Sequence, residues 1–537
     1  MPRSRPLILP LLVTACTSPS FQKESADTQA YAILQQTALA VAGQDKVFPL
    51  ERPVDTLRQR LLTSPSPVRL SLLDALDVAA ENSREFQRQK ETLYLAALNL
   101  TRSEHDFSLR FDLTGSAAVG GTADDAVDVQ LGDGLAAAAN STAGTTLVAS
   151  FVNTFLRSVI HGGAFDGSSI LNLTLTQPLL RGAGRRIARE PLTQAERDVV
   201  YAMRAFEHFR STFVVGVVSA YYDVVRQIAD LKNVEANYQS LVQSSLQIEE
   251  LGKAGRRTIT DLGRARQSEY SGDAQRVVTR NRLQTSLDRF RLTLGLPVTA
   301  PVELDPAELD RLTAQGVVPL QLDEQQLIAL AQERRYDHRT TIDEVEDAGR
   351  RVLVSEDALD MVLDFTAALN VPAEAGKGLN LDWSKVNWSA GFQLDLALDK
   401  LVERNAYRAA LISLDAAIRT REQSGDQIAA DVRAEIRNIQ TDYDSYRIQL
   451  AAVPLAAQRV EATTDLYDAG RAQAIDKLDA QNSLLQAQLS LSQAVVDYAV
   501  ARLSLMRDLE ALVLEPKGLR FDPALPMPQP RVAEQQP

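Results

Sequence analysis

Two aspartates three positions apart, Asp476 and Asp479, follow a glycine turn in the segment YDAGRAQAIDKLDAQ (467–481). Residues with this spacing lie about one turn apart on the same face of an α-helix. If several copies of the helix met around one opening, the carboxylates would form a concentrated negative field that attracts cations. Acidic residues also cap helix N-termini and compensate the helix dipole. The pair alone is compatible with both roles, so the surrounding elements have to be considered.

Other residue types give little support for catalysis. The histidines are widely separated, without metal-ligand spacing to one another or to a cysteine. No GxSxG motif, phosphate-binding loop or dinucleotide fingerprint lies between a strand and a helix. The formal charge of −13, without any basic cluster, argues against a nucleic-acid partner. We therefore expect a protein that is not an enzyme and uses no cofactor.

The single cysteine, Cys16, ends the segment RSRPLILPLLVTAC, in which two arginines precede a short apolar run. The VTAC stretch (13–16) resembles a bacterial lipobox, whose cysteine receives a lipid and becomes the mature N-terminus. This interpretation predicts that residues 1–15 are a signal peptide and that Cys16 is the lipidated residue. A chance cysteine near a chain end is the alternative.

The chain contains two similar halves. Sliding it by 252 positions lays LSLLDALDVAAENSRE (70–85) over LDEQQLIALAQERRYD (322–337). Later, ELGKAGRRTITDLGRA matches DLYDAGRAQAIDKLDA, with Gly255 on Gly470. These similarities predict a tandem duplication.

Each half has the order helix, strand, strand, long helix, turn, helix. Apolar residues recur at steps of four and three from Ile428 to Val453, which indicates one helix over about 402–469. Pro454 should kink this helix, which would span roughly 100 Å at 1.5 Å per residue. An ordinary coiled coil is the alternative interpretation of such stripes. The other expected helices lie at about 71–107, 187–254, 261–294, 323–358 and 476–511.

In the expected strand segments, apolar and polar residues alternate with a period of two. In VNWSAGFQLDL (386–396) and ILNLTLTQ (170–177), apolar and polar residues face opposite ways. This pattern is typical of a membrane barrel around water, and a half-buried sheet in a soluble domain is the alternative. Four strands cannot close a barrel, so three copies would be needed to give twelve. Residues 121–168 form a Gly, Ala and Asp-rich insertion, and an additional strand within it is left open.

These features together resemble the TolC-like outer-membrane efflux channels, including their lipoprotein members. The resemblance covers roughly residues 70–512 and includes the duplication, both glycine turns, QPLLRGAG (177–184) before the long helix, and AYYDVV (220–225). It implies a mainly α fold with a small β part. The expected architecture is a tandem-duplicated long-helix α-barrel topped by a trimeric 12-stranded transmembrane β-barrel, with four strands per chain.

The resemblance also implies function and partners. It implies a lipid-anchored homotrimer in the bacterial outer membrane, contacting membrane lipid and extending into the periplasm. The trimer would be a passive conduit to the exterior in a tripartite efflux or type I secretion system, with a periplasmic adaptor and an inner-membrane pump as partners. A periplasmic coiled-coil scaffold or adaptor without a pore is the alternative.

Site residues follow from the same resemblance. Asp476 and Asp479 would form an acidic ring at the periplasmic entrance, where cations could bind. Relatives close this entrance with residues of both turns, but Ala472 stands where their arginine would be. The gate candidates are Thr260, Asp261, Tyr467 and Arg471, and the turn tips are Gly255 and Gly470.

The expected divisions of the chain follow the duplication. They are a signal peptide (1–15), an N-terminal periplasmic extension (16–69), a first repeat (70–295), an equatorial linker (296–321), a second repeat (322–512) and a Pro-rich tail (513–537).

Overall fold

A computed structural model describes most of the chain. The expected signal peptide and Cys16 lie outside the described residues, as does the tail beyond residue 521. The described residues are 18–43, 49–53, 55–64, 66–121, 127–158, 166–305, 307–317, 323–373, 380–396, 398–515 and 518–521.

The chain forms two compact units, each assembled from three segments. Unit 1 contains Met1–Val47, Thr92–Arg204 and Thr340–Glu422. Unit 2 contains Phe48–Glu91, Ala205–Arg339 and Gln423–Pro537. Both units draw on both repeats, and each is described by itself below.

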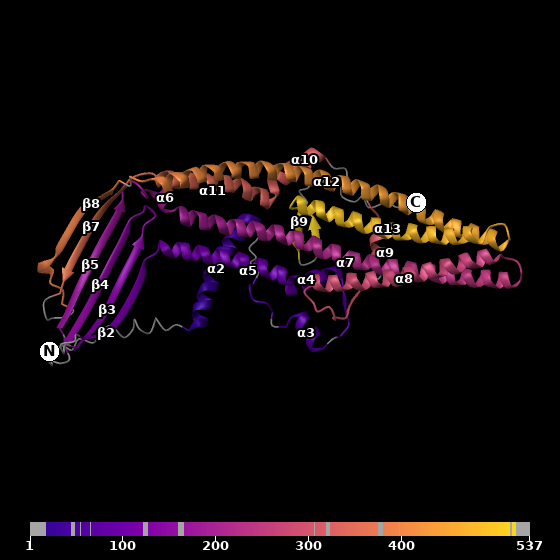
Figure 1. Cartoon of the computed structure of the whole chain (residues 1–537), viewed down its shortest axis with the longest axis horizontal. Helices are drawn as coiled ribbons and strands as arrows, with labels where there is room; N and C mark the ends of the chain where they lie inside the picture. Colours follow the sequence, from indigo (N-terminus) through magenta and orange to yellow (C-terminus); the bar gives the residue numbers. More distant parts are fainter. Residues whose placement is uncertain are drawn as a thin grey trace, which may run out of the picture. The chain divides into compact units, whose positions relative to one another are not determined.

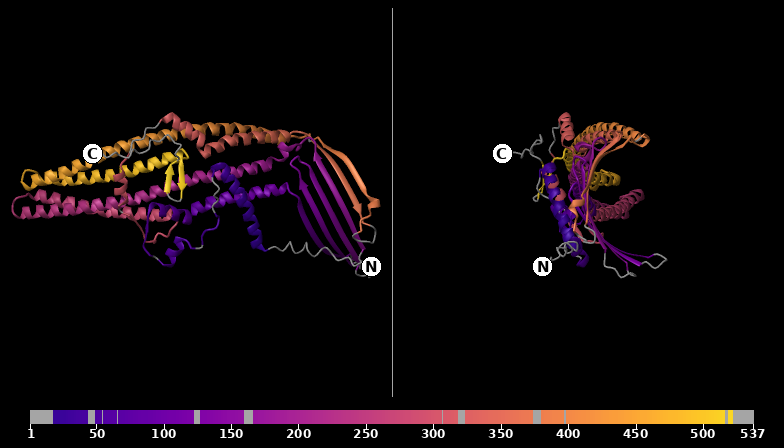
Figure 2. Two further views of the ribbon diagram at one scale, coloured as in Figure 1. Left: turned by 180° about the vertical axis from the view of Figure 1, so that it is seen from behind. Right: turned by 90° about the vertical axis from the view of Figure 1, so that its left-hand side faces the viewer.

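Unit 1 contains one six-stranded antiparallel sheet (Figure 1). Its order is β2-β3-β4-β5-β7-β8, so every neighbour but one is also the next strand along the chain. The left-hand view of Figure 2 shows the same strands from behind. The strands are β2 (Arg110–Gly121), β3 (Val127–Asn140), β4 (Thr146–Ser158), β5 (Asp166–Pro178), β7 (Val362–Pro372) and β8 (Asn387–Asp395).

The expected number of four strands per chain is therefore wrong for this sheet, which has six. The additional strands, β3 and β4, lie within the segment 121–168 that we interpreted as an insertion. Strand β3 contains the stretch LGDGLAAAA, whose Gly and Ala side chains are too small to produce a hydrophobic alternation. Strand β4 carries apolar residues on both faces, which hides its period of two.

Unit 1 also contains helices and parts of helices. They are α2 (Pro19–Ala42), α6 (Arg185–Ala188), most of α5 (Arg84–Asp106) and α11 (Tyr336–Asp357), and the first parts of α7 (Glu190–Lys253) and α12 (Leu401–Asp468). Helices α7 and α11 are joined by ion pairs around Asp347, which is 2% exposed. The Asp347 carboxylate lies 2.7 Å from Arg197 Nε and accepts a hydrogen bond of 2.6 Å from the Tyr201 hydroxyl.

Unit 2 contains the turn ends of the long helices. Its elements are α3 (Leu57–Thr63), β1 (Val68–Leu70), α4 (Leu72–Asn82), α8 (Ile259–Thr293), β6 (Val302–Leu304), α9 (Glu308–Gln315), α10 (Glu324–Arg334), α13 (Ala474–Asp508), β9 (Leu512–Glu515) and β10 (Gly518–Phe521). Strands β1 and β6 pair in parallel, which joins the N-terminal extension to the equatorial linker.

Apolar stripes build the core of unit 2. Val217 and Tyr221 of α7 pack with Phe290 of α8, and all three side chains are at most 1% exposed. A second cluster joins Ile428 of α12 to Leu505 of α13. The helical periodicity read from the sequence is thus confirmed as core packing.

The expected helices are present with small differences. The segment expected at 71–107 is divided into α4 and α5 at Ser83. The backbone of Gly295 approaches there so closely that a Cβ on Gly295 would lie 2.2 Å from the Asn82 carbonyl oxygen. The segment expected at 323–358 is likewise divided, at Arg335.

Pro454 lies inside the single helix α12. No helix among the residues described combines the length and apolarity needed to cross a membrane.

Candidate functional site

The two hairpins α7–α8 and α12–α13 end in matching turns, and helices α8 and α13 contact each other (Figures 1 and 2). Gly255 and Gly470 occupy the turns with φ of 73° and 74°, a conformation that favours glycine because a Cβ would be strained there. The amide of Arg256 donates to the Leu251 carbonyl at 2.9 Å, and that of Arg471 donates to the Leu466 carbonyl at 2.8 Å. The alignment of Gly255 with Gly470 is thus matched by equivalent geometry.

The helices after both turns begin with an acidic cap. In α8, Thr258 and Asp261 each accept a hydrogen bond from the other's backbone amide at 3.2 Å. In α13, Asp476 accepts from the Gln473 amide at 2.9 Å. Asp476 therefore has a capping role within one chain. Asp479 is exposed on the same face of α13, and its carboxylate accepts no hydrogen bond from the described residues.

Tyr467, at the end of α12, is the largest fully buried side chain of this region, with 1% exposure. The guanidinium of Arg257 lies over its ring at 4.1 Å and donates to the Tyr467 carbonyl at 3.3 Å. The Lys477 ammonium lies 5.3 Å from the same ring centroid. Burial raises the pKa of the Tyr467 hydroxyl, while Arg257 acts in the opposite direction. Two cations thus hold one aromatic ring between the two turns.

Lys477 lies between the two aspartates in sequence but on the opposite face of α13, with 7% exposure. Its ammonium donates to the side-chain oxygen of Gln247 on α7 at 3.0 Å, and the amide of Gln247 donates to Asp468 at 2.8 Å. Burial lowers the pKa of the Lys477 ammonium, and Asp468 opposes that effect. These bonds join α7, α12 and α13 next to Tyr467.

A polar contact one turn further along α13 adds to this connection. Gln481, which is 6% exposed, donates to the hydroxyls of Ser240 at 2.7 Å and Ser244 at 3.1 Å. Asn237 donates to the Gln481 backbone carbonyl at 3.1 Å. The two hairpins are therefore held together by side chains of α7 and α13 as well as by their turns.

The structure brings together only part of the predicted site. Tyr467 and Asp261 lie in the hydrogen-bonded and packed region just described, whereas Thr260 and Arg471 are exposed. The arginine that contacts Tyr467 is Arg257 of the first turn, which sequence reasoning missed. Its position two residues after the turn glycine could have suggested it, because that places it beside the matching turn of the other repeat.

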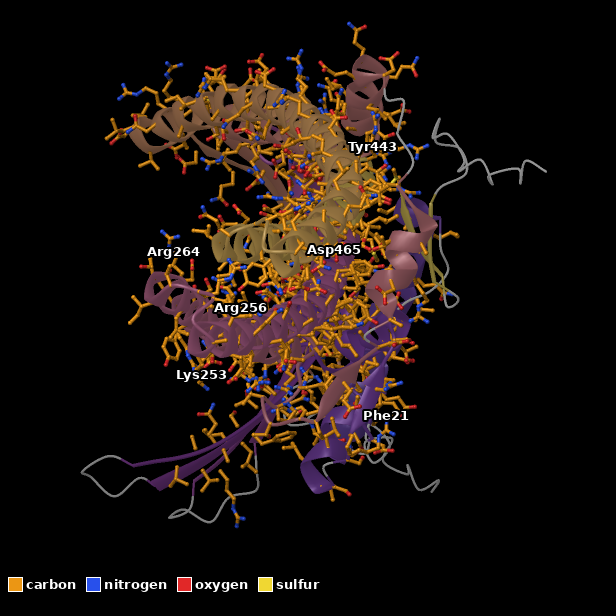
Figure 3. The ribbon with its side chains drawn as sticks, turned by 90° about the vertical axis from the view of Figure 1, so that its right-hand side faces the viewer. Phe21, Lys253, Arg256, Arg264, Tyr443 and Asp465 are labelled. Carbon is orange, nitrogen blue, oxygen red and sulfur yellow. The ribbon has the colours of Figure 1, made fainter. Side chains whose placement is uncertain are left out.

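Charged side chains surround the turn ends. Figure 3 labels Lys253, Arg256 and Arg264 on the α7–α8 hairpin and Asp465 on α12. Lys253 forms an ion pair with Glu250 at 2.8 Å. No group of three or more His, Cys, Asp or Glu side chains that could hold a metal ion occurs within the described ranges.

Comparisons with known proteins agree on one family. The family model "Outer membrane efflux protein" matches residues 362–509, in the second repeat. The outer membrane protein TolC of Vibrio cholerae is 26% identical over 329 residues, covering 60% of this chain and 73% of that protein. TolC of Escherichia coli is 21% identical over 369 residues, covering 65% and 71%. The chain is therefore similar to the outer-membrane efflux proteins of the TolC family.

Solved structures of outer-membrane channel proteins share the fold of this chain. The outer membrane protein VceC of Vibrio cholerae superposes with a TM-score of 0.59 at 16% identity, covering 82% of this chain and 95% of VceC. The CmeC outer membrane channel of Campylobacter jejuni gives a TM-score of 0.61 at 13% identity, covering 86% and 93%. The curated relatives and VceC are outer-membrane proteins by name, and CmeC is an outer-membrane channel.

Proposed function

We propose that this protein is a trimeric, passive efflux conduit from the periplasm to the exterior. In this proposal an inner-membrane pump supplies the energy through a periplasmic adaptor, in a tripartite efflux or type I secretion system. The sheet edges β2 and β8 have no strand partner among the described residues. Neighbouring copies would pair these edges and so close a barrel.

The observation that carries the proposal is the register of the predicted strands. One row of paired residues crosses β5, β7 and β8 as Leu173, Leu369 and Trp388. The next row, on the opposite face, is Asn172, Asn370 and Asn387. Trp388 is 77% exposed and Leu173 is 38% exposed, so the described residues leave these two side chains of the apolar row largely uncovered. One apolar and one polar face across several strands is the arrangement of a membrane barrel around water.

A pair of substitutions on β5 tests the barrel. Leu173→Arg places a charge on the proposed lipid face and should cost about 2–4 kcal/mol at mid-membrane. Thr174→Arg should be mild, because that side chain would face water. The readout is the yield of heat-modifiable trimer after outer-membrane extraction. Equal tolerance of both substitutions would show that β5 does not face lipid.

A periplasmic scaffold without a pore remains the second candidate, since long helices also serve such proteins. Extraction separates the two candidates. A channel requires detergent for release from the membrane, because its sheet is embedded in lipid. A scaffold held only at the membrane surface is released by high salt or alkali.

We also propose that Cys16 anchors the mature chain by a lipid, on the basis of the VTAC segment. Labelling with a fatty-acid analogue should occur in the parent and be lost in Cys16→Ser. The variant should still fold, because an acyl chain adds membrane affinity without core packing. Equal labelling of both proteins would refute the anchor.

A further inference from the structure

The hairpin β3–β4 (residues 127–158) is the part of the sheet that the sequence did not predict. Its strands have 14 and 13 residues. A strand that crosses a bilayer at a tilt needs about 9–11 residues. Both strands are therefore long enough to span the membrane beside β5.

The two rows that define the faces of β5 continue without interruption through the hairpin. The apolar row runs from β2 to β5 as Phe111, Ala137, Ala149 and Leu173. The next apolar row is Leu113, Leu135, Phe151 and Leu171. The intervening row on the other face is Asp112, Ala136, Ser150 and Asn172. The hairpin thus has the same two faces as the strands predicted to lie in the membrane.

Strand β3 carries this argument more strongly than β4. Leu131 and Leu135 are 39% and 40% exposed on the apolar face. Gln130, Gly132 and Gly134 alternate with them on the other face. The opposite face of β4 is mixed, because it includes Val148 and Val152 together with Ser150 and Thr154.

One polar row interrupts the apolar face, and two of its side chains are hydrogen-bonded to each other. Asp133 lies opposite Asn153 in the register, and Asn153 lies opposite Ser169. The Asn153 amide donates to the Asp133 carboxylate at 2.7 Å, and Asn153 is 3% exposed. This hydrogen bond lowers the cost of keeping the Asn153 amide nitrogen away from water. The buried Asn153 Oδ1 has no hydrogen-bond partner among the described residues.

The turn of the hairpin is fixed at the end of the sheet nearest the helices. The Ser141 amide donates to the Thr145 carbonyl at 2.7 Å, so the connection is short. Asn140 donates through its side chain to the Asp106 carbonyl at the end of α5, at 3.1 Å. The Thr145 hydroxyl donates to Gln177 of β5. A short turn on the periplasmic side is typical of outer-membrane barrels.

Gly144 shows how closely this turn packs. It has a φ of 91°, and a Cβ at this position would lie 2.8 Å from the Gly182 carbonyl oxygen and 3.0 Å from Pro178 Cγ. The hairpin is therefore seated against the QPLLRGAG segment that begins the helical part of unit 1. A hairpin that lay outside the membrane would not need to pack so closely against this segment.

We propose that β3–β4 is an additional transmembrane hairpin, so that each copy contributes six strands to the barrel. The inference rests on the proposed function, in which three copies share one barrel. The barrel then has eighteen strands rather than twelve.

Strands β2 and β8 run in opposite directions because the order contains five antiparallel pairings. The closing contact between copies is therefore also antiparallel. Barrels of 16–18 strands leave an open aqueous channel.

Cysteine accessibility in lipid nanodiscs tests the inference. The variants are Leu135→Cys and Ala136→Cys on β3, matched by Leu173→Cys and Thr174→Cys on β5. The parent, with Cys16 alone, gives the background. A membrane-impermeant maleimide should label Ala136→Cys and Thr174→Cys. Labelling of Leu135→Cys and Leu173→Cys should be almost completely lost until detergent unfolds the trimer.

The four variants distinguish a failure of the additional hairpin from a failure of the barrel itself. If maleimide labels Thr174→Cys but not Leu173→Cys on β5, and labels both positions on β3, the proposal of an additional transmembrane hairpin is overturned. The proposal of a barrel then still stands. Equal labelling of both β5 positions would overturn the barrel itself. Electron cryomicroscopy of the nanodisc trimer gives an independent count. Eighteen strands would support the inference and twelve would overturn it.

Discussion

At the scale of single residues, Arg257 is the group that determines how Tyr467 is held. We predict that Arg257→Ala loosens the two turns, because the cation–π contact and the bond to the Tyr467 carbonyl are both lost. The expected cost is about 0.5–2 kcal/mol. Hydrogen exchange at the start of α13 should become faster, and single-channel conductance should rise if these turns restrict the entrance.

Arg471→Ala is the matched control for Arg257→Ala. Arg471 is exposed at the neighbouring turn, and its side chain forms no hydrogen bond or ion pair with the described residues. We expect exchange at α13 to stay as in the parent. Faster exchange in Arg471→Ala than in Arg257→Ala would show that the predicted gate arginine is the effective one.

The aspartates could be found from the sequence because they follow a repeated glycine turn, and Tyr467 because it lies just before that turn where relatives have a tyrosine. The role of Arg257 could not, since it depends on a contact between residues 210 positions apart. The inward orientation of Lys477 could not be predicted either, because a lysine between two aspartates suggests an exposed charge. In the structure it turns inward and donates to Gln247.

At the scale of elements, the turn of β3–β4 depends on Gly144. We predict that Gly144→Ala lowers the stability of the trimer by about 1–3 kcal/mol, because a residue with a side chain is strained at positive φ. The Cβ would also meet the backbone oxygen of Gly182. The measurement is the temperature at which the purified trimer dissociates.

Gly115→Ala on β2 is the control for Gly144→Ala. Its added methyl group would meet nothing within 4 Å. The dissociation temperature should change little, or rise slightly because alanine restricts the unfolded chain. An equal decrease in both variants would mean that the tight fit at Gly144 does not matter.

The helices and the strands differ in how far the sequence predicted them. The long helices were predicted to within a few residues, since apolar stripes at steps of three and four are repeated over many turns. The breaks at Ser83 and Arg335 were missed, and the first depends on the approach of Gly295. Strand β3 was missed because its Gly and Ala residues give no visible pattern, and β4 because it carries apolar residues on both faces.

At the scale of the whole molecule, we predict that Asp476 and Asp479 together set ion preference. Threefold repetition would place six carboxylates at one opening. The double variant Asp476→Asn with Asp479→Asn should reduce cation selectivity in planar bilayers. It should also weaken block by multivalent cations added from the periplasmic side.

Assembly should survive this double change, because asparagine keeps the size of the side chain and can still cap α13. Asp476 is the member of the pair that caps, so Asp479→Asn alone should affect selectivity without affecting stability. Unchanged selectivity together with lower thermal stability would mean that the aspartates are structural.

The placement of β3–β4 also has an evolutionary consequence. The hairpin lies in the sequence between the C-terminal end of β2 and the N-terminal end of β5. One insertion or deletion in the gene could therefore add or remove the whole hairpin. Without it, Phe111 would meet Leu173 in the register that Ala137 and Ala149 now bridge. The direction of every other strand would be unchanged. Lineages could therefore change the width of the pore in steps of one hairpin while inheriting the same periplasmic machinery.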